Sequence, residues 1–143
     1  MKLIRIRPAK AKDVSAIIRL NKEGLTPYRW TYDGGYIRRA VSHGNYYVIC
    51  RNKMVAGAIK FYLEKNYLWI STMAIFKKYR GHGYAKKLMN FIEKKTKKYG
   101  YAKIRLDTLT ISRVGKFYQK MGYILIEEGP YYGRKYQIYE KTI

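Results

Sequence analysis

The segment from Tyr67 to Leu109 constrains the fold more than any other part of the 143-residue chain. Its apolar start predicts a strand over residues 67–75, and its last part, "YAKIRLDTL", alternates apolar and charged residues as a strand does. Between them, apolar residues recur at helical spacing from Tyr84 to Ile92. A strand–helix–strand connection of this length makes the two strands parallel, with a right-handed crossover. The chain is therefore predicted to be an α/β protein.

The remaining segments indicate antiparallel strands with helices between them. Strands are expected over residues 3–7, 45–52, 53–66, 123–127 and 136–142, and the segment "EGPYYGRK" is expected to connect the last two. Helices are expected from Asp13 and over residues 36–42. A further helix, capped by Ser112 and stopped by Gly122, carries an apolar stripe made of Val114, Phe117, Tyr118 and Met121. We predict a single domain, residues 1–143, with a mixed, mainly antiparallel sheet of six or seven strands and about four flanking helices.

The composition limits the class of protein. No run approaches 18 apolar residues and the start of the chain lacks the apolar block of a signal peptide, which predicts a soluble, cytoplasmic protein. Cys50 is the single cysteine, so an internal disulfide is excluded and a small buried side chain is expected. His43 and His82 lie far from it and do not have the spacing of metal ligands, so no metal is expected.

The net charge is the strongest compositional signal. The sequence has 31 Lys and Arg against 9 Asp and Glu, a formal charge of +22 that exceeds what solubility requires. An A/T-rich codon bias towards Lys, Ile and Tyr is one explanation, and an anionic partner is the other. A nucleic acid is the alternative partner that this charge suggests.

A glycine turn, "RGHG", separates the predicted strand ending at Ile75 from the helix beginning near Tyr84. A strand that turns directly into a helix leaves several backbone N–H groups unpaired beside the positive helix end. Gly81 and Gly83 carry no side chains that would keep a phosphate from these groups. The spacing fits neither a P-loop nor a dinucleotide fingerprint, and glycine is common in tight turns that bind nothing.

The arrangement Arg80-x-x-Gly83-x-Ala85, after the strand "LWISTMAIF", resembles the pyrophosphate loop of the GNAT family of N-acetyltransferases. The segment "RVGKFYQKMGY" resembles a second family motif, and "IRIRPAKAKDVSAI" is similar to its opening strand and helix. These matches follow the family order over essentially the whole chain. The resemblance implies transfer of an acetyl group from acetyl-CoA, the co-substrate, to a primary amine by direct attack.

The family pattern also implies roles for individual residues. Backbone groups of the strand before the turn would bind the pantetheine arm, and the amides of the turn would bind the pyrophosphate. The cofactor-binding set implied in this way is Met73, Ala74, Ile75, Arg80, Gly81, His82, Gly83, Tyr84, Ala85 and Lys86. Tyr118, by its place in the second motif, would be the general acid that protonates the leaving sulfur. Its position on an apolar stripe is equally consistent with a core residue.

Two departures from the family pattern concern this chemistry. The Asn often found before the last motif helix is missing, with Ile111 and Ser112 near its place, and the loop after Asp107 is about one residue short. The strand before the turn also lacks the acidic residue that often serves as a base. The candidates left for the base are Asp33, Asp107, Glu127 and Glu128.

The acceptor is expected to meet two aromatic, basic segments, "TPYRWTYDGGY" and "EGPYYGRKY". The residues implied for acceptor binding are Tyr28, Trp30, Tyr32, Asp33, Tyr131 and Tyr132. Tyr131 and Tyr132 resemble tyrosines with which protein N-terminal acetyltransferases hold a peptide, although these side chains could instead pack within their own loop. A peptide or protein amine is the leading acceptor. The alternatives are aminoacyl-tRNA acetylation and a non-catalytic nucleic-acid-binding module on the same fold.

Overall fold

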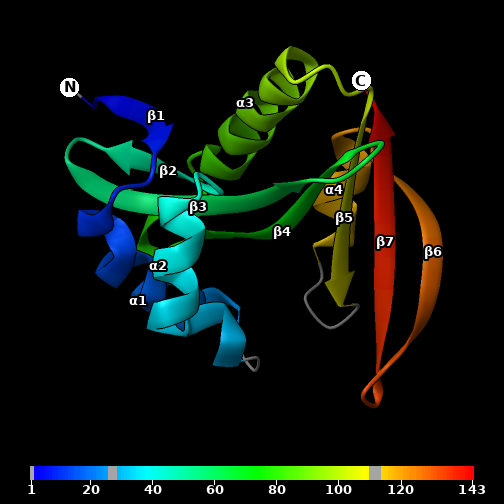
Figure 1. Ribbon diagram of the computed structural model, residues 1–143, viewed down its shortest axis with the longest axis horizontal. Helices are drawn as coiled ribbons and strands as arrows, with labels where there is room; N and C mark the ends of the chain where they lie inside the picture. Colours follow the sequence, from blue (N-terminus) through cyan, green and yellow to red (C-terminus); the bar gives the residue numbers. More distant parts are fainter. Residues whose placement is uncertain (1, 26–28, 110–113) are drawn as a thin grey trace. The chain divides into compact units, whose positions relative to one another are not determined.

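The predicted strand–helix–strand unit is confirmed by the computed structural model, which describes residues 2–25, 29–109 and 114–143. Strand β4 (Leu68–Ile75) leads through the glycine turn to helix α3 (Tyr84–Lys98) and then to strand β5 (Lys103–Leu109). The two strands are parallel neighbours, with Leu68 opposite Ile104 and Ile70 opposite Leu106 (Figure 1). The helical crossover is what permits this parallel pairing.

The described strands form one seven-stranded mixed sheet in the order β1-β2-β3-β4-β5-β7-β6. The other strands are β1 (Ile4–Pro8), β2 (Tyr46–Arg51), β3 (Met54–Leu63), β6 (Ile124–Tyr131) and β7 (Arg134–Thr142). The other helices are α1 (Val14–Gly24), α2 (Gly34–Ser42) and α4 (Gly115–Lys120), with short 3-10 turns η1 (Ala11–Asp13), η2 (Arg29–Tyr32) and η3 (Lys77–Tyr79). The pairs β1–β2, β2–β3, β5–β7 and β6–β7 are antiparallel, as expected.

The chain forms two compact units: Met1–Phe61 with Thr72–Phe91, and Tyr62–Ser71 with Ile92–Ile143. The single domain expected from the chain length stays a prediction.

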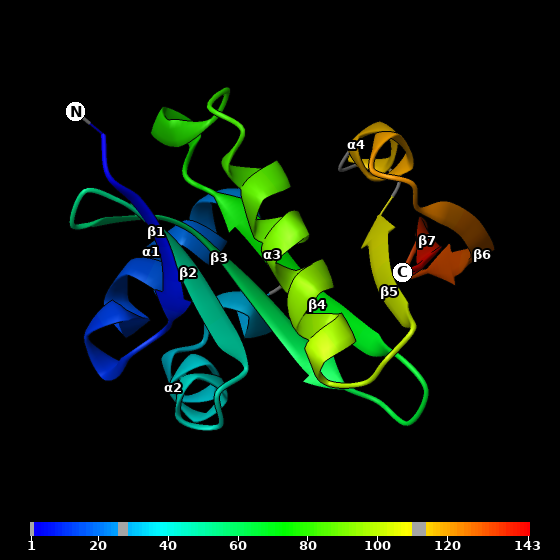
Figure 2. The same cartoon turned by 90° about the horizontal axis from the view of Figure 1, so that it is seen from above.

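The first unit packs helices on both faces of its strands (Figure 2). Alternate residues of β2, including Val48 and Cys50, face the buried side chains of α1 and α2, such as Ile17 and Ile37. On the opposite face, Tyr47 makes an edge contact with Phe91 of α3 at 4.8 Å. Cys50 is buried, as predicted for a single cysteine. Alternation along the strand therefore supplies apolar side chains to both layers.

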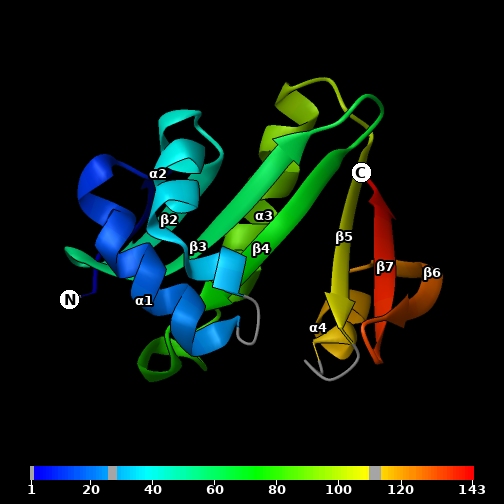
Figure 3. The same cartoon turned by 60° about the horizontal axis from the view of Figure 1, so that its bottom comes forward.

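The second unit contains β5, β7, β6, α4 and the last turns of α3 (Figure 3). Its two C-terminal strands correct the sequence analysis, because residues 128–135 are mostly strand and not a connection. Strand β6 continues to Tyr131 and β7 starts at Arg134, so only Tyr132 and Gly133 make the turn. Both have positive φ angles, 46° and 76°, which suits a two-residue hairpin turn.

Helix α4 starts later than the sequence indicates. The expected cap, Ser112, lies outside the described residues, and Val114 occupies the N-cap position. Val114 is also 36% exposed, so its assignment to the buried stripe is wrong. Tyr118 is the member of that stripe that becomes buried. Gly122 follows the helix with a φ of 94°, and it ends α4 as predicted.

Candidate active site

The turn between β4 and α3, in the first unit, is open beside its two glycines. Gly81 and Gly83 have φ angles of 83° and 78°, in the left-handed region that favours glycine. A Cβ atom added at either position would meet no atom within 4 Å. The two glycines are thus required by the backbone conformation, and the space beside them is accessible to a ligand.

The backbone amides of this turn suit an anion. Lys87 N–H donates to the Gly83 carbonyl at 3.1 Å, which starts the hydrogen-bond ladder of α3. The N–H groups of Tyr84, Ala85 and Lys86 precede that bond and have no acceptor within the helix. They lie at the positive end of a 15-residue helix. Amides and helix dipole together favour a phosphate or pyrophosphate group.

The turn is fixed to the rest of the first unit by two side chains. Arg80 Nε donates to the Ile75 carbonyl at 3.0 Å, so this side chain connects the turn to the end of β4. Glu23, in α1, accepts a hydrogen bond from the Lys77 N–H at 2.5 Å. These two contacts connect the turn to β4 and to α1.

The two aromatic residues of the turn differ in exposure. His82 is exposed, and its ring stacks on that of Tyr84 with centroids 5.6 Å apart. Tyr84 is buried, and its hydroxyl has no hydrogen-bond partner among the described residues. A buried hydroxyl of this kind is normally satisfied, so it is a candidate to bond with a ligand at the turn.

The end of β4 depends on a glycine that sequence analysis missed. A Cβ atom on Gly57 of β3 would lie 2.7 Å from the Ala74 carbonyl oxygen and 2.4 Å from Ile75 Cδ1. Gly57 therefore permits β3 to approach the segment expected to bind the pantetheine arm. Ala74 and Ile75 are buried and Met73 is half-buried. A glycine inside the strand "MVAGAIKFYL" was the available signal.

Tyr118, in the second unit, is held by aromatic neighbours and backbone bonds. Its ring makes an edge contact with Tyr123 at 5.9 Å and a tilted contact with Tyr139 at 6.3 Å. Its carbonyl accepts hydrogen bonds from the N–H groups of Met121 at 3.1 Å and Tyr123 at 3.0 Å. Gly115 is needed here, because a Cβ would lie 2.5 Å from the Tyr139 hydroxyl.

The environment of Tyr118 keeps its phenol protonated. Burial raises the pKa of the Tyr118 hydroxyl, and the carboxylate of Asp107 raises it further. Because this pKa lies above its ordinary value of 10.0, the proton is retained throughout the neutral range. The group is therefore a neutral phenol at neutral pH, with a proton available to donate.

The four candidate bases differ in what they contact. Asp33 caps α2 by accepting from the Tyr36 N–H at 2.8 Å. Glu127 accepts from the Tyr136 hydroxyl at 2.9 Å, and Glu128 accepts from Gln137 Nε2 at 3.0 Å. Asp107 is exposed and makes no hydrogen bond to another side chain among the described residues. Its carboxyl group is partly desolvated by the surrounding protein, and this desolvation raises its pKa.

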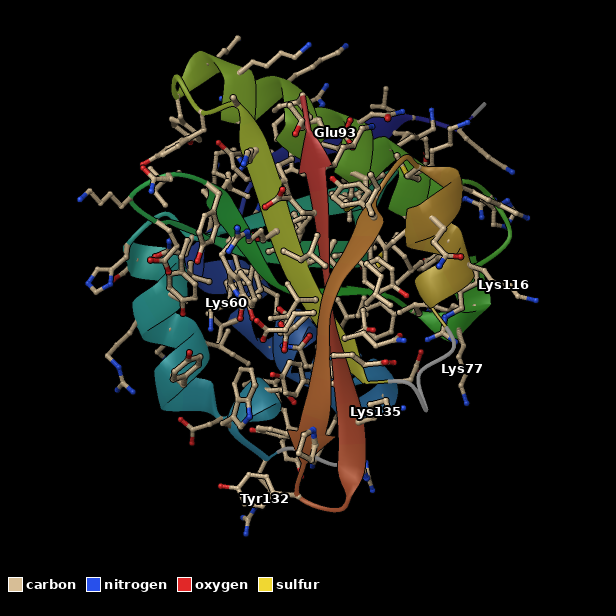
Figure 4. The ribbon with its side chains drawn as sticks, turned by 90° about the vertical axis from the view of Figure 1, so that its right-hand side faces the viewer. Lys60, Lys77, Glu93, Lys116, Tyr132 and Lys135 are labelled. Carbon is tan, nitrogen blue, oxygen red and sulfur yellow. The ribbon has the colours of Figure 1, made fainter. Side chains whose placement is uncertain are left out.

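One acceptor residue expected in the first unit, Trp30, lies near a side chain that sequence analysis did not identify. Trp30 is exposed and meets Tyr36 edge-on at 5.8 Å, while Tyr32 is half-buried near Lys22. Tyr28 lies outside the described residues. Beneath these rings lies Lys60 of β3, fully buried, with Nζ 3.8 Å from the Tyr36 ring centroid and 5.7 Å from that of Trp30 (Figure 4).

The burial of Lys60 is electrostatically unfavourable. Removal from water lowers the pKa of its ammonium, and the contact with Tyr36 opposes that shift. A lysine in the middle of an apolar strand was the sequence signal for this feature. We find it beneath the aromatic side chains of η2 and α2, where one end of the acceptor was expected.

The two tyrosines expected in the second unit lie at the tip of the β6–β7 hairpin (Figure 4). Tyr131 is 41% exposed and Tyr132 is 87% exposed, with ring centroids 4.8 Å apart and planes nearly perpendicular. Tyr132 is therefore largely exposed to solvent, whereas Tyr131 is more than half covered.

Among the described residues, no group of three His, Cys, Asp or Glu side chains is placed to hold a metal ion. In the same part of the chain, no helix is long and apolar enough to cross a membrane.

Comparison with known proteins places these features in a family. A family model described as "Acetyltransferase (GNAT) domain" matches residues 42–125. No curated protein sequence matches the chain. Among solved structures, Ard1 from Thermoplasma volcanium is 20% identical, with a TM-score of 0.90 over 98% of this chain and 97% of that one.

Two further solved structures have the same fold. Arabidopsis thaliana Naa50, in complex with the bisubstrate analogue CoA-Ac-MVNAL, is 24% identical, with a TM-score of 0.81 over 98% of this chain and 99% of that one. The ribosomal-protein-S18-alanine N-acetyltransferase from Escherichia coli is 13% identical, with a TM-score of 0.82 over 99% of this chain and 94% of that one. At these identities the likeness shows a shared fold.

Proposed function

Because the chain belongs to the GNAT family of acetyl-CoA-dependent N-acetyltransferases, we propose that its acceptor is the amine of a peptide or protein. The observation that carries this proposal is the exposed pair Tyr131 and Tyr132 at a hairpin tip. Two rigid aromatic rings with polar hydroxyls can hold a peptide at little cost in conformational entropy. Two proteins that share the fold support it: Naa50 is in complex with the bisubstrate analogue CoA-Ac-MVNAL, and the Escherichia coli protein is named a ribosomal-protein-S18-alanine N-acetyltransferase.

Acetyl-CoA is proposed to bind at the glycine turn. The amides from Gly81 to Lys86 would hold the pyrophosphate, since the expected Arg80 N–H donates instead to the Lys77 carbonyl at 3.2 Å. The end of β4, Met73 to Ile75, would pair with the pantetheine arm. The open space beside Gly81 and Gly83 supports this assignment, as does the buried Tyr84 hydroxyl. Lys86 is exposed one turn into α3, where it would add positive charge near the phosphates.

For the reaction, we propose direct attack of the acceptor nitrogen on the thioester carbonyl. The C–S bond breaks, the sulfur takes a proton from Tyr118, and the proton that the nitrogen releases as the amide forms restores the Tyr118 phenol. The acceptor ammonium must first lose a proton, and Asp107 is the proposed base. Both residues belong to the second unit, and the negative charge of Asp107 contributes to the raised pKa of Tyr118, which supports these paired roles.

Binding of acetyl-CoA is tested by thermal denaturation with a matched pair of variants. Gly83→Glu places a carboxylate at the turn and should abolish the rise in Tm that acetyl-CoA produces. Gly44→Glu is the control, because Gly44 has the same φ of 78°, equally open surroundings and no part in the turn. An unchanged ligand shift in Gly83→Glu, or its equal loss in Gly44→Glu, would contradict the assignment.

The acceptor is tested by thiol release from acetyl-CoA with peptides, small amines and aminoacyl-tRNA as acceptors. We expect peptides to give the highest kcat/KM. Replacing Tyr131 and Tyr132 together with Ala should raise KM for peptides and leave KM for acetyl-CoA unchanged. A preference for aminoacyl-tRNA, or an unaffected peptide KM in the double variant, would overturn the proposed acceptor.

A further inference from the structure

One face of α3 carries lysines and is exposed to solvent. Helix α3 has six lysines and a single acidic residue, Glu93. At about 100° per residue, Lys94, Lys97 and Lys98 fall within an arc of about 100°. All three side chains are exposed, whereas Ile92 is buried on the opposite side. We call Lys94, Lys97 and Lys98 the lysine face.

The carboxylate nearest to this face is engaged elsewhere. Glu93 lies at its edge, and its two oxygens accept hydrogen bonds from Lys141 Nζ at 2.9 Å and the Tyr123 hydroxyl at 3.1 Å. The positive charge of the lysine face is therefore not neutralised from within α3. Like charges at i,i+3 and i,i+4 destabilise a helix slightly, whereas Lys97 and Lys98 lie in the last turn and interact favourably with the helix dipole, so helix stability explains only part of the arrangement.

Lys95 does not belong to this face. Its position is about 60° beyond Lys98 around the helix, and its side chain is half-buried and takes part in another interaction. The exposed set is thus three lysines, one fewer than the sequence run suggests.

Acetyl-CoA accounts for only part of the charge on α3. Coenzyme A carries about four negative charges at neutral pH, two of them on a terminal phosphate. Lys86 and Lys87 follow directly on the glycine turn, whereas the lysine face begins about 12 Å further along the helix axis from Lys86. Lys86 and Lys87, and not the lysine face, are therefore near the proposed pyrophosphate position.

We propose that the lysine face binds the phosphate backbone of a nucleic acid, independently of base sequence. A duplex presents about one negative charge per 1.7 Å, a density that three lysines within about 6 Å of helix can match. Lysine interacts with phosphates as a point charge and needs no base contact, so sequence-indifferent binding follows. This partner lies beyond the acetyl transfer proposed above and does not depend on it.

A membrane surface is a less suitable partner for the same face. Helices that lie on membranes insert an apolar face between the lipids. The apolar face of α3, which includes Leu88, Met89 and Ile92, is fully buried within the protein. An external partner of α3 could therefore contact only its charged side chains. The dense charge of a nucleic acid suits these side chains better than a membrane surface does.

The experiment compares two triple variants of the full chain. Lys94→Gln, Lys97→Gln and Lys98→Gln remove the lysine face. The control combines Lys2→Gln, Arg5→Gln and Lys53→Gln, which removes three exposed cations from the β1–β2 region. Binding of a fluorescent 20-base-pair RNA duplex is measured by anisotropy from 50 to 200 mM salt, with saturating CoA occupying the glycine turn. Vesicles containing phosphatidylserine form a second arm.

We expect wild-type protein to bind the duplex with a log–log salt slope near −0.9 for each phosphate neutralised. The lysine-face variant should lose about 2 to 3 units of that slope, and the control should lose less than one. Acetyl-CoA turnover should be unchanged in both variants, which separates this inference from the proposed enzyme activity. No binding of the duplex at 50 mM salt, an equal loss in the control, or binding to vesicles alone would each overturn the proposal.

Discussion

Glu93 is the residue whose replacement should most directly test the packing around Tyr118. Its carboxylate connects α3 to two distant parts of the second unit, accepting from Tyr123 hydroxyl and from Lys141 Nζ. Tyr123 in turn contacts the Tyr118 ring and donates its N–H to the Tyr118 carbonyl. Figure 4 shows Glu93 near the end of β7, which carries Lys141. The change we consider is Glu93→Ala.

The expected loss of stability follows from what Glu93→Ala leaves behind. A hydrogen bond to a charged group contributes about 1.5–3 kcal/mol, and the Tyr123 hydroxyl would remain in a buried site without its acceptor. Lys141 is partly exposed, so its ion pair adds only about 0.5 kcal/mol after solvent screening. We therefore expect a total loss of about 2–3.5 kcal/mol. Glu93→Gln keeps one acceptor oxygen and should lose about half as much.

Glu140→Ala provides a matched control. Glu140 is 17% exposed, close to the 14% of Glu93, and it also pairs with two groups. Its partners are Arg105 and Lys103, which are 35% and 46% exposed and regain water when the carboxylate is removed. An exposed pair of this kind contributes about 0–1 kcal/mol. The two Ala variants should thus differ by more than 1 kcal/mol.

Urea denaturation followed by circular dichroism measures both variants, and Tyr123→Phe completes a double-mutant cycle with Glu93→Ala. We expect a coupling energy of about 1–2 kcal/mol between Glu93 and Tyr123. Burial and then Glu93 raise the pKa of the Tyr123 hydroxyl above its ordinary 10.0, so the stability that it contributes is complete below pH 10 and declines as pH rises further. A loss in Glu93→Ala no larger than that in Glu140→Ala would refute this reasoning.

Three further outcomes are expected. Tyr118→Phe should lower kcat by about 10²-fold and leave acetyl-CoA affinity unchanged; near-normal turnover in single-turnover experiments would make Tyr118 a core residue only. Asp107→Asn should lower kcat/KM by about 10²-fold at pH 7. It should also remove the acidic limb of the pH profile of kcat/KM, because the raised pKa of Asp107 sets that limb, whereas Glu128→Gln should retain it. Lys60→Met should raise Tm at pH 7, because a buried ammonium is replaced by an apolar chain. Burial lowers the pKa of Lys60 from 10.5, so the wild-type protein becomes more stable as pH rises towards 10.5 and the buried ammonium loses its proton. The difference in Tm between Lys60→Met and wild type should therefore shrink between pH 7 and 10. A difference in Tm that stays constant over this range would contradict the prediction.

The sequence by itself determined the features that depend on neighbours along the chain. Apolar periodicity predicted the parallel pair β4 and β5 with α3 between them, because the connection length restricts the topology. The turn at Gly81 and Gly83 was predicted from residue type, since glycine adopts positive φ at little cost. The order of motifs was enough to predict the GNAT family, which the comparison confirmed.

Other features were decided only by the tertiary structure, because they join residues that are distant in sequence. Glu93 meets residues 30 and 48 positions away, and no local pattern specifies those contacts. The burial of Lys60 under Tyr36 depends on how α2 packs on β3, and the exposure of Tyr132 depends on the register of β6 and β7. Strand register and helix packing are set by the sum of many side-chain contacts, so a single sequence could supply candidates for these sites but not their partners.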